Sequence, residues 1–157
     1  MSDSKLSLPP LNHMFVASIS EVSNNDLRVV VVEGRRGQTP IETEVGLAFP
    51  VKPDETCRAF MITWWDYVAY AVRNESYFRR EEGEPDYEPL GVRSESAFLR
   101  YVAQTTFASD DYPGPLAHWA LYTEWHCIDV VSSIAPEVEE IPYAEVVWGL
   151  GERGGAG

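Results

Sequence analysis

The densest cluster of side chains that could do chemistry lies between residues 124 and 129. Its members are Glu124, His126, Cys127 and Asp129. Side chains of these types bind transition metals. In a strand that rises about 3.3 Å per residue with alternating faces, Glu124 and His126 point one way while Cys127 and Asp129 point the other. Three ligands from this stretch cannot converge, so we expect a core cysteine, no metal site and no cofactor.

A cysteine nucleophile activated by a histidine is the second chemistry to consider. The chain has two cysteines, Cys57 and Cys127, and the second lies close in sequence to His118 and His126. Such a pair must come within hydrogen-bond reach in the fold. Neighbouring side chains of a strand face opposite ways, so His126 and Cys127 cannot meet without a bend. We interpret both cysteines as buried free thiols and lean against an enzyme.

Aromatic residues concentrate in residues 60–79, which hold seven of the chain's nineteen. Large rings dominate either a core or an interface. One alternative is a pocket for a flat ligand, because apolar clefts with few polar groups bind small molecules. That pocket would be lined by Trp64, Tyr70, Trp119 and His126. From Tyr67 to Val72 both strand faces are apolar, so we assign most of these rings to the core and leave the two ends of the segment as binding candidates.

Acidic residues set the electrostatic character of the chain. Twenty-five acids against twelve bases give a net charge of −13, and residues 80–157 hold fifteen of the acids and four of the bases. A field of this sign repels nucleic acid and anionic membranes, and it attracts basic proteins. Three interpretations stay open: the acidity attracts a basic protein partner, it only keeps the protein soluble, or it mimics nucleic acid. A homo-oligomer is also left open.

The candidate binding surface joins the end of the aromatic segment to the acidic loop at 81–88. Residues 73–76 form a compact polar set where the aromatic strand ends, and strand ends and loops carry function more often than strand centres. The loop lacks the glycine position and terminal glutamate of a calcium loop, so we interpret it as an electrostatic handle. The candidate binding residues are Trp64, Trp65, Asp66, Arg73, Asn74, Glu75, Tyr77, Glu81, Glu82, Glu84, Asp86, Trp119, Trp125 and His126.

Strands must position most of these residues. Residues 14–22 and 27–33 have strand patterns, and residues 41–49 alternate as a half-buried strand does. Residues 58–74 are too long for one strand, so we expect a bend near Trp65-Asp66, followed by a central strand covered on both faces. Residues 116–132 are also too long, and we place their bend near Thr123-Glu124.

One helix is expected at about 95–107, capped by Ser94 or Ser96. An acidic run after Pro136 closes the core, and residues 143–148 add an edge strand. The predicted fold class is α+β, with a twisted, mainly antiparallel sheet of about six strands and a partly closed barrel as the alternative. Residues 1–12 are expected to form a flexible arm, 13–148 a single globular domain and 149–157 a disordered tail.

The sequence does not identify a catalytic function. No secretion signal or membrane-spanning stretch is present, so we expect a cytoplasmic protein. We interpret the chain as a non-catalytic acidic module that binds a basic protein, either regulatory or immunity-like. In charge and tryptophan content it resembles small immunity proteins that neutralise toxins, a resemblance of composition that no motif carries. The alternatives are the aromatic pocket, with ligand binding or catalysis, and a structural subunit of a homo-oligomer.

Overall fold

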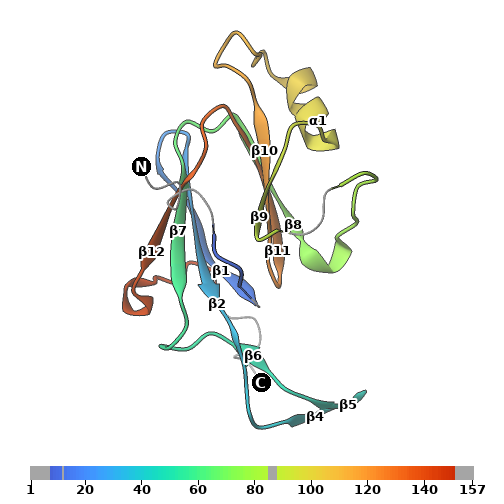
Figure 1. Ribbon diagram of the computed structural model, residues 1–157, viewed down its shortest axis with the longest axis vertical. Helices are drawn as coiled ribbons and strands as arrows, with labels where there is room; N and C mark the ends of the chain where they lie inside the picture. Colours follow the sequence, from blue (N-terminus) through green and yellow to red (C-terminus); the bar gives the residue numbers. More distant parts are fainter. Residues whose placement is uncertain (1–7, 12, 85–87, 151–157) are drawn as a thin grey trace.

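Two four-stranded antiparallel sheets pack against each other in the computed structural model, which describes residues 8–11, 13–84 and 88–150 (Figure 1). The first sheet has the order β1 (Met14–Ser23), β2 (Asp26–Glu33), β7 (Ala59–Trp64) and β12 (Glu137–Ile141). The second has the order β8 (Ala69–Asn74), β11 (His126–Ser132), β10 (Ala117–Tyr122) and β9 (Leu90–Arg93). The predicted α+β class with mainly antiparallel strands is confirmed.

Buried side chains from both sheets meet in a core between the sheets. Val29 and Val31 of β2 meet Leu121 of β10 and Ile128 of β11 in one buried cluster. Val30, the residue between the two valines, belongs to a smaller cluster on the outer face of the first sheet. Strand β2 is thus buried on both faces, and this explains its unbroken β-branched run.

The outer face of the second sheet carries the single α-helix of the described residues, α1 (Ala97–Thr105) (Figure 1). Ser96 caps it, because its side-chain oxygen accepts a hydrogen bond from the backbone N–H of Leu99. Val102 is the buried anchor of the helix on the sheet. The helix predicted at 95–107 and its cap at Ser96 are confirmed.

Both predicted bends are present. Strand β7 ends at Trp64, and the chain turns at Trp65 and Asp66 before β8, with Asp66 at a φ of 57°. The backbone N–H of Asp66 donates to the side chain of Asp26, so this turn is fastened to the β1–β2 hairpin. Strands β10 and β11 are likewise separated by a turn at residues 123–125.

The sheet arrangement differs from the predicted one. The strands form two separate four-stranded sheets, not one sheet of about six, and no barrel closes. Strand β8 is an edge strand rather than a central one, and Val72 is exposed. The residues on its outer face, Ala69 and Ala71, are small and apolar without needing a second layer above them. The apolar pattern on both faces therefore led to a wrong prediction, because β8 lies at the edge of its sheet and is not a buried central strand.

Residues 41–49 are the largest departure from expectation. They form a hairpin of β4 (Ile41–Thr43) and β5 (Gly46–Ala48), in which Gly46 turns the chain at a φ of 122°. Val45 at the tip is 98% exposed. With β3 (Arg35–Arg36) and β6 (Val51–Lys52), the hairpin makes an arm that projects away from both sheets (Figure 1). The prediction of a half-buried strand is wrong here, because the apolar face has no sheet to cover it.

The end of the domain also departs from prediction. The acidic run after Pro136 contains β12, whose residues pair with β7, so it is a strand and not only a closing segment. Residues 143–148 contain the short 3₁₀ helix η3 (Tyr143–Glu145) and no strand. A second 3₁₀ helix, η2 (Glu75–Tyr77), follows β8.

Parts of the predicted arm and tail lie against the sheets. Leu8 is buried in the core cluster and Leu11 packs against it. The backbone N–H groups of Gly149 and Leu150 donate to Ala17 of β1. The remainder of these two predictions, at residues 1–7, 12 and 151–157, falls outside the described residues. No helix in the described ranges is long and apolar enough to cross a membrane.

Candidate functional site

Strand register gathers polar side chains on the outer face of the second sheet. Ile128 and Val130 point into the core, so Asp129 between them faces outward. Its direct neighbours across the sheet are Ala71 on β8 and Ala120 on β10. Because these neighbours are small, the Asp129 carboxylate stands in a depression rather than on a crowded surface.

A chain of hydrogen bonds runs through Asp129. Its Oδ1 lies 2.7 Å from Nε2 of His118, and Nδ1 of His118 lies 2.8 Å from Oγ of Ser96. Its Oδ2 accepts from Nε and Nη2 of Arg73, at 3.2 and 3.0 Å. Asp129 and His118 are each 3% exposed. The chain therefore ties β8, β10 and β11 to the first turn of α1.

The order serine, histidine, aspartate is that of a hydrolase triad, so its chemistry needs a test. An ionised Asp129 can only accept, so Nε2 of His118 carries the proton it shares with the carboxylate, and Nδ1 can accept from the Ser96 hydroxyl. Ser96 is buried, and its oxygen already accepts from Leu99. Neither ring nitrogen of His118 is left for a substrate. The Ser96–His118–Asp129 hydrogen bonds therefore form a structural polar network that holds the helix against the sheet.

This network makes a specific prediction for Ser96. Ser96→Ala removes both the helix cap and the partner of His118, so we expect the free energy of unfolding to fall by about 1–2 kcal/mol. Urea denaturation measures it. Ser94→Ala is the matched control: Ser94 is exposed and caps nothing, so a change within about 0.5 kcal/mol is expected. Equal effects of the two substitutions would contradict the assignment of the cap and the network.

Above the network lies a cleft of about 410 Å³, called here the arginine cleft. Three arginines and three acids contribute to its lining. They are Arg73, Arg79 and Arg93, with Glu81, Glu84 and Asp129. In a chain of net charge −13, this balance makes the cleft unusually rich in cations.

Glu81 organises one wall of the arginine cleft. Its carboxylate accepts from Nη1 of Arg93 at 2.9 Å, from Nη2 of Arg100 at 3.2 Å and from the backbone N–H of Ala97 at 2.9 Å. Burial alone would raise the pKa of Glu81, but these hydrogen bonds outweigh it and hold the pKa below its usual value. Glu81 thus serves as an internal anion at the start of α1.

A second depression adjoins the first at Tyr122 and has the opposite character. This acidic hollow, of about 280 Å³, contains two carboxylates and no lysine or arginine among the described residues that line it. Its lining residues are Met14, Glu75, Phe78, Tyr122, Thr123, Glu124 and Cys127. Burial and a hydrogen bond to Glu84 raise the pKa of Tyr122, so its hydroxyl stays protonated at neutral pH.

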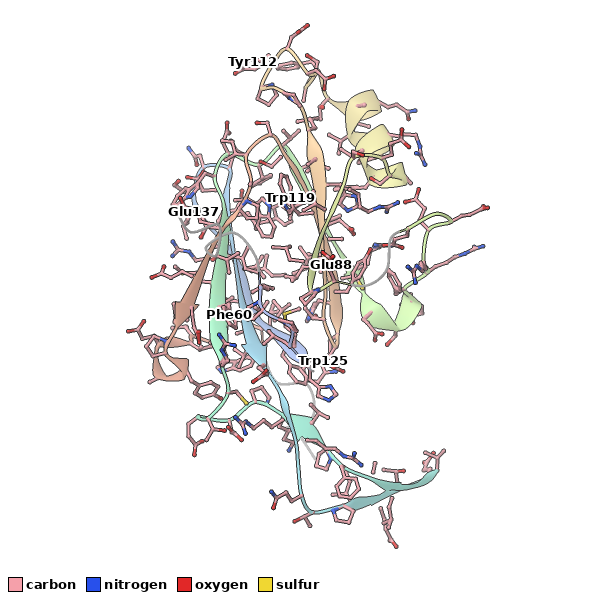
Figure 2. All side chains as sticks on the ribbon, in the orientation of Figure 1. Phe60, Glu88, Tyr112, Trp119, Trp125 and Glu137 are labelled. Atoms are coloured by element: carbon pink, nitrogen blue, oxygen red, sulfur yellow. The ribbon has the colours of Figure 1, made fainter. Side chains whose placement is uncertain are left out.

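Two exposed aromatic residues, Trp125 and Tyr77, are sequence neighbours of Glu124 and Phe78, which line the acidic hollow. Trp125, in the turn before β11, is 52% exposed, and its ring meets Phe15 edge to face at 5.0 Å (Figure 2). Tyr77 of η2 is 85% exposed. The backbone N–H of Glu75 donates to the carbonyl of Trp125, so η2 and the β10–β11 turn are joined at this point.

The candidate binding residues within the described ranges are divided among five places. Trp65 and Asp66 lie in the turn after β7, at the opposite end of β8 from residue 74. Trp64 and Trp119 lie in the core, and Figure 2 shows Trp119 between the two sheets. Near the acidic hollow are Asn74, Glu75, Tyr77, Trp125 and His126, and in the arginine cleft are Arg73, Glu81 and Glu84. Glu82 is exposed in a turn, and Asp86 is outside the described residues.

The predicted aromatic pocket has no counterpart among the described cavities. Trp64 and Trp119 belong to the buried cluster, and Tyr70 packs against it. Burial lowers the pKa of His126, whose Nδ1 is buried without a hydrogen-bond partner. Burial also raises the pKa of the Cys127 thiol to about 11, as expected of an inert core cysteine. Within the described ranges, no three His, Cys, Asp or Glu side chains are grouped to hold a metal ion.

The predicted binding residues did not include Arg79, Arg93, His118 and Asp129 of the arginine cleft. They also did not include Ser96, which bonds to His118 in the network below the cleft. We found no match to a protein-family model, to a curated protein or to a solved structure. Function must therefore be argued from the two depressions themselves.

Proposed function

We propose that this protein is a non-catalytic binding module that docks a basic protein through the acidic hollow. The observation that supports this best is the lining of the hollow, where Glu75 and Glu124 supply carboxylates beside apolar and aromatic walls. A lysine or arginine side chain combines an apolar stem with a charged head. The hollow has the complementary pattern.

The proposed docking follows from that complementarity. A partner's basic side chain inserts its stem against Met14 and Phe78, and its head lies between the carboxylates of Glu75 and Glu124. Glu124 already pairs with Nδ1 of His13 at 2.9 Å, which holds the carboxylate in place. Desolvated charge pairs of this kind slow dissociation, whereas rim charges mainly raise the association rate.

Trp125 and Tyr77 provide the rest of the proposed interface. Tryptophan and tyrosine are common hot-spot residues, and both Trp125 and Tyr77 are exposed. Phe15 holds the Trp125 ring in place, so little side-chain entropy is lost when a partner covers it. The net charge of −13 steers a basic partner toward this face and disfavours nucleic acid and anionic membranes. We further propose that the module acts in the cytoplasm, where its two free cysteines stay reduced.

The test uses a pair of double variants with equal change in net charge. Glu75→Gln/Glu124→Gln removes the two carboxylates of the acidic hollow, and Glu42→Gln/Glu44→Gln removes two exposed carboxylates of the arm. Basic proteins captured by the wild-type chain are purified, and their Kd is measured against all three forms. We expect the hollow variant to weaken binding by about 30-fold or more, and the arm variant by less than about threefold.

Salt dependence provides the second readout. The association rate of the wild-type chain is expected to fall as NaCl rises from about 0.05 to about 0.5 M, because salt screens the steering field. The proposal is overturned if no basic protein binds, if the two double variants weaken binding equally, or if the association rate does not change with NaCl concentration.

A further inference from the structure

The arginine cleft contains a guanidinium that no carboxylate of the described chain neutralises. Arg73 pairs with Asp129, and Arg93 pairs with Glu81. Arg79 also lines the cleft, yet within the described ranges it makes no hydrogen bond or ion pair. Among the described residues, Arg79 is thus a cation without a counter-charge at the cleft, in a chain that has about twice as many acids as bases.

Arg73 also keeps donor capacity for a ligand. A guanidinium has five N–H donors, and Asp129 receives its bonds from Nε and Nη2. The Nη1 group is thus left over, and the Arg73 side chain is 47% exposed. Asp129 holds the Arg73 side chain in position. Asp129 itself is bonded to His118, which is bonded to Ser96. A pre-positioned guanidinium loses little entropy when it binds an anion.

The floor of the cleft leaves room for a ligand. Ala71 lines it, and Gly91 lies on the same face, opposite Ala120. A Cβ added at Gly91 would meet nothing within 4 Å, so neither crowding nor a left-handed backbone requires glycine there. The volume of about 410 Å³ falls within the usual range for small-molecule sites, about 300–1,000 Å³. Phe98 and Tyr122 supply aromatic walls.

We propose that the arginine cleft binds a small molecule through its carboxylate or phosphate group, which lies between Arg79 and Nη1 of Arg73. The apolar part of the ligand rests against Phe98. The cleft differs from the acidic hollow in charge and shares only Tyr122 with it among their described lining residues, so this site does not depend on the proposed function. Glu84, on the cleft wall, opposes anion binding and sets a modest affinity.

The test titrates inorganic phosphate and, separately, benzoate into the ¹⁵N-labelled protein at constant ionic strength, with chloride as the reference anion. Saturable shifts are expected at Arg73, Arg79 and Ala97 for at least one probe. Saturation by phosphate alone identifies a phosphate site, and saturation by benzoate alone identifies a carboxylate site with an aromatic wall. If both saturate, the site recognises the shared anionic chemistry.

Three substitutions and a control make the test specific to the cleft. Arg79→Gln should weaken binding at least tenfold, and Ala71→Leu should abolish it by filling the floor without changing charge. Glu84→Gln should tighten binding a few-fold. Arg36→Gln is the control, because its guanidinium stacks on Phe49 of the arm, away from the cleft. The proposal is overturned if neither probe saturates, if Arg79→Gln binds as the wild type does, or if Arg36→Gln weakens binding equally.

Discussion

Replacing Asp129 with alanine is expected to lower the free energy of unfolding by about 3 kcal/mol. The carboxylate accepts three hydrogen bonds from His118 and Arg73 while almost fully buried. Without it, the buried Nε2–H of His118 has no acceptor, which is the costly part of the change. Arg73 is half exposed, so water solvates its released charge and limits the loss. Urea denaturation followed by tryptophan fluorescence measures the effect.

Two further variants separate the parts of this cost. Asp129→Asn keeps an oxygen for His118 but loses the charge opposite Arg73, so its cost should be about half as large. Arg73→Gln removes the half-exposed partner and should cost about 1 kcal/mol or less. A loss below about 1 kcal/mol for Asp129→Ala would show that the Ser96–His118–Asp129 chain does not hold the sheet and helix together.

The second large effect is expected at Trp64, the largest fully buried side chain. Trp64→Ala opens a cavity between the sheets and should cost about 3–5 kcal/mol. Trp64→Phe should cost far less, because Nε1 of Trp64 is buried without a hydrogen-bond partner and phenylalanine removes that donor. Chemical denaturation measures both free energies of unfolding.

Trp125 provides the matched control for Trp64. It is the same residue type in an exposed position, so Trp125→Ala should change the free energy of unfolding by less than about 1 kcal/mol. If Trp125→Ala destabilises the fold as much as Trp64→Ala does, the division into core and surface tryptophans is wrong. If Trp64→Ala is neutral, Trp64 does not anchor the core between the sheets. Of the aromatic residues at 60–79, only Phe60 and Trp64 are buried, so the prediction that most of these rings belong to the core is wrong.

Local signals in the sequence predicted the elements well. The bends after Trp64 and at residues 123–125 followed from run lengths that exceed a single strand, and both are present. The helix followed from its apolar spacing and from a serine that can cap it, and Ser96 does so. These features depend on residues close in sequence, where periodicity and capping chemistry carry the information.

Assignments that depend on distant partners were wrong. The alternation of residues 41–49 is the same whether or not a sheet lies over the apolar face, and here none does. Gly46 was the local sign of a hairpin. For β8, apolar residues on both faces suggested a central strand, although its outer alanines need no cover. Periodicity specifies a face, but the element that covers the face is set by the rest of the chain.

The arginine cleft was only partly within reach of the sequence. In the structure, antiparallel pairing sets Ala120 opposite Asp129, and His118 lies diagonally across on the same face. The predicted bend indicates that the two strands pair, but it does not set this register, and a shift of one residue would turn the other face of the strand toward the cleft. The positions of Arg79 and Arg93 could not be derived from the sequence either, because Arg79 reaches the cleft from the segment after η2 and Arg93 reaches it from β9. The positions of these two arginines depend on the strand order of the second sheet, β8-β11-β10-β9.

The arm of β3 to β6 has a consequence for how this chain can diverge. Ile41, Val45 and Leu47 are exposed and belong to neither buried cluster. Substitutions among them leave the sandwich almost untouched, so selection for folding hardly constrains them. The arm can therefore change in sequence far faster than the sheets do. Homologous chains that share this fold can present quite different arms.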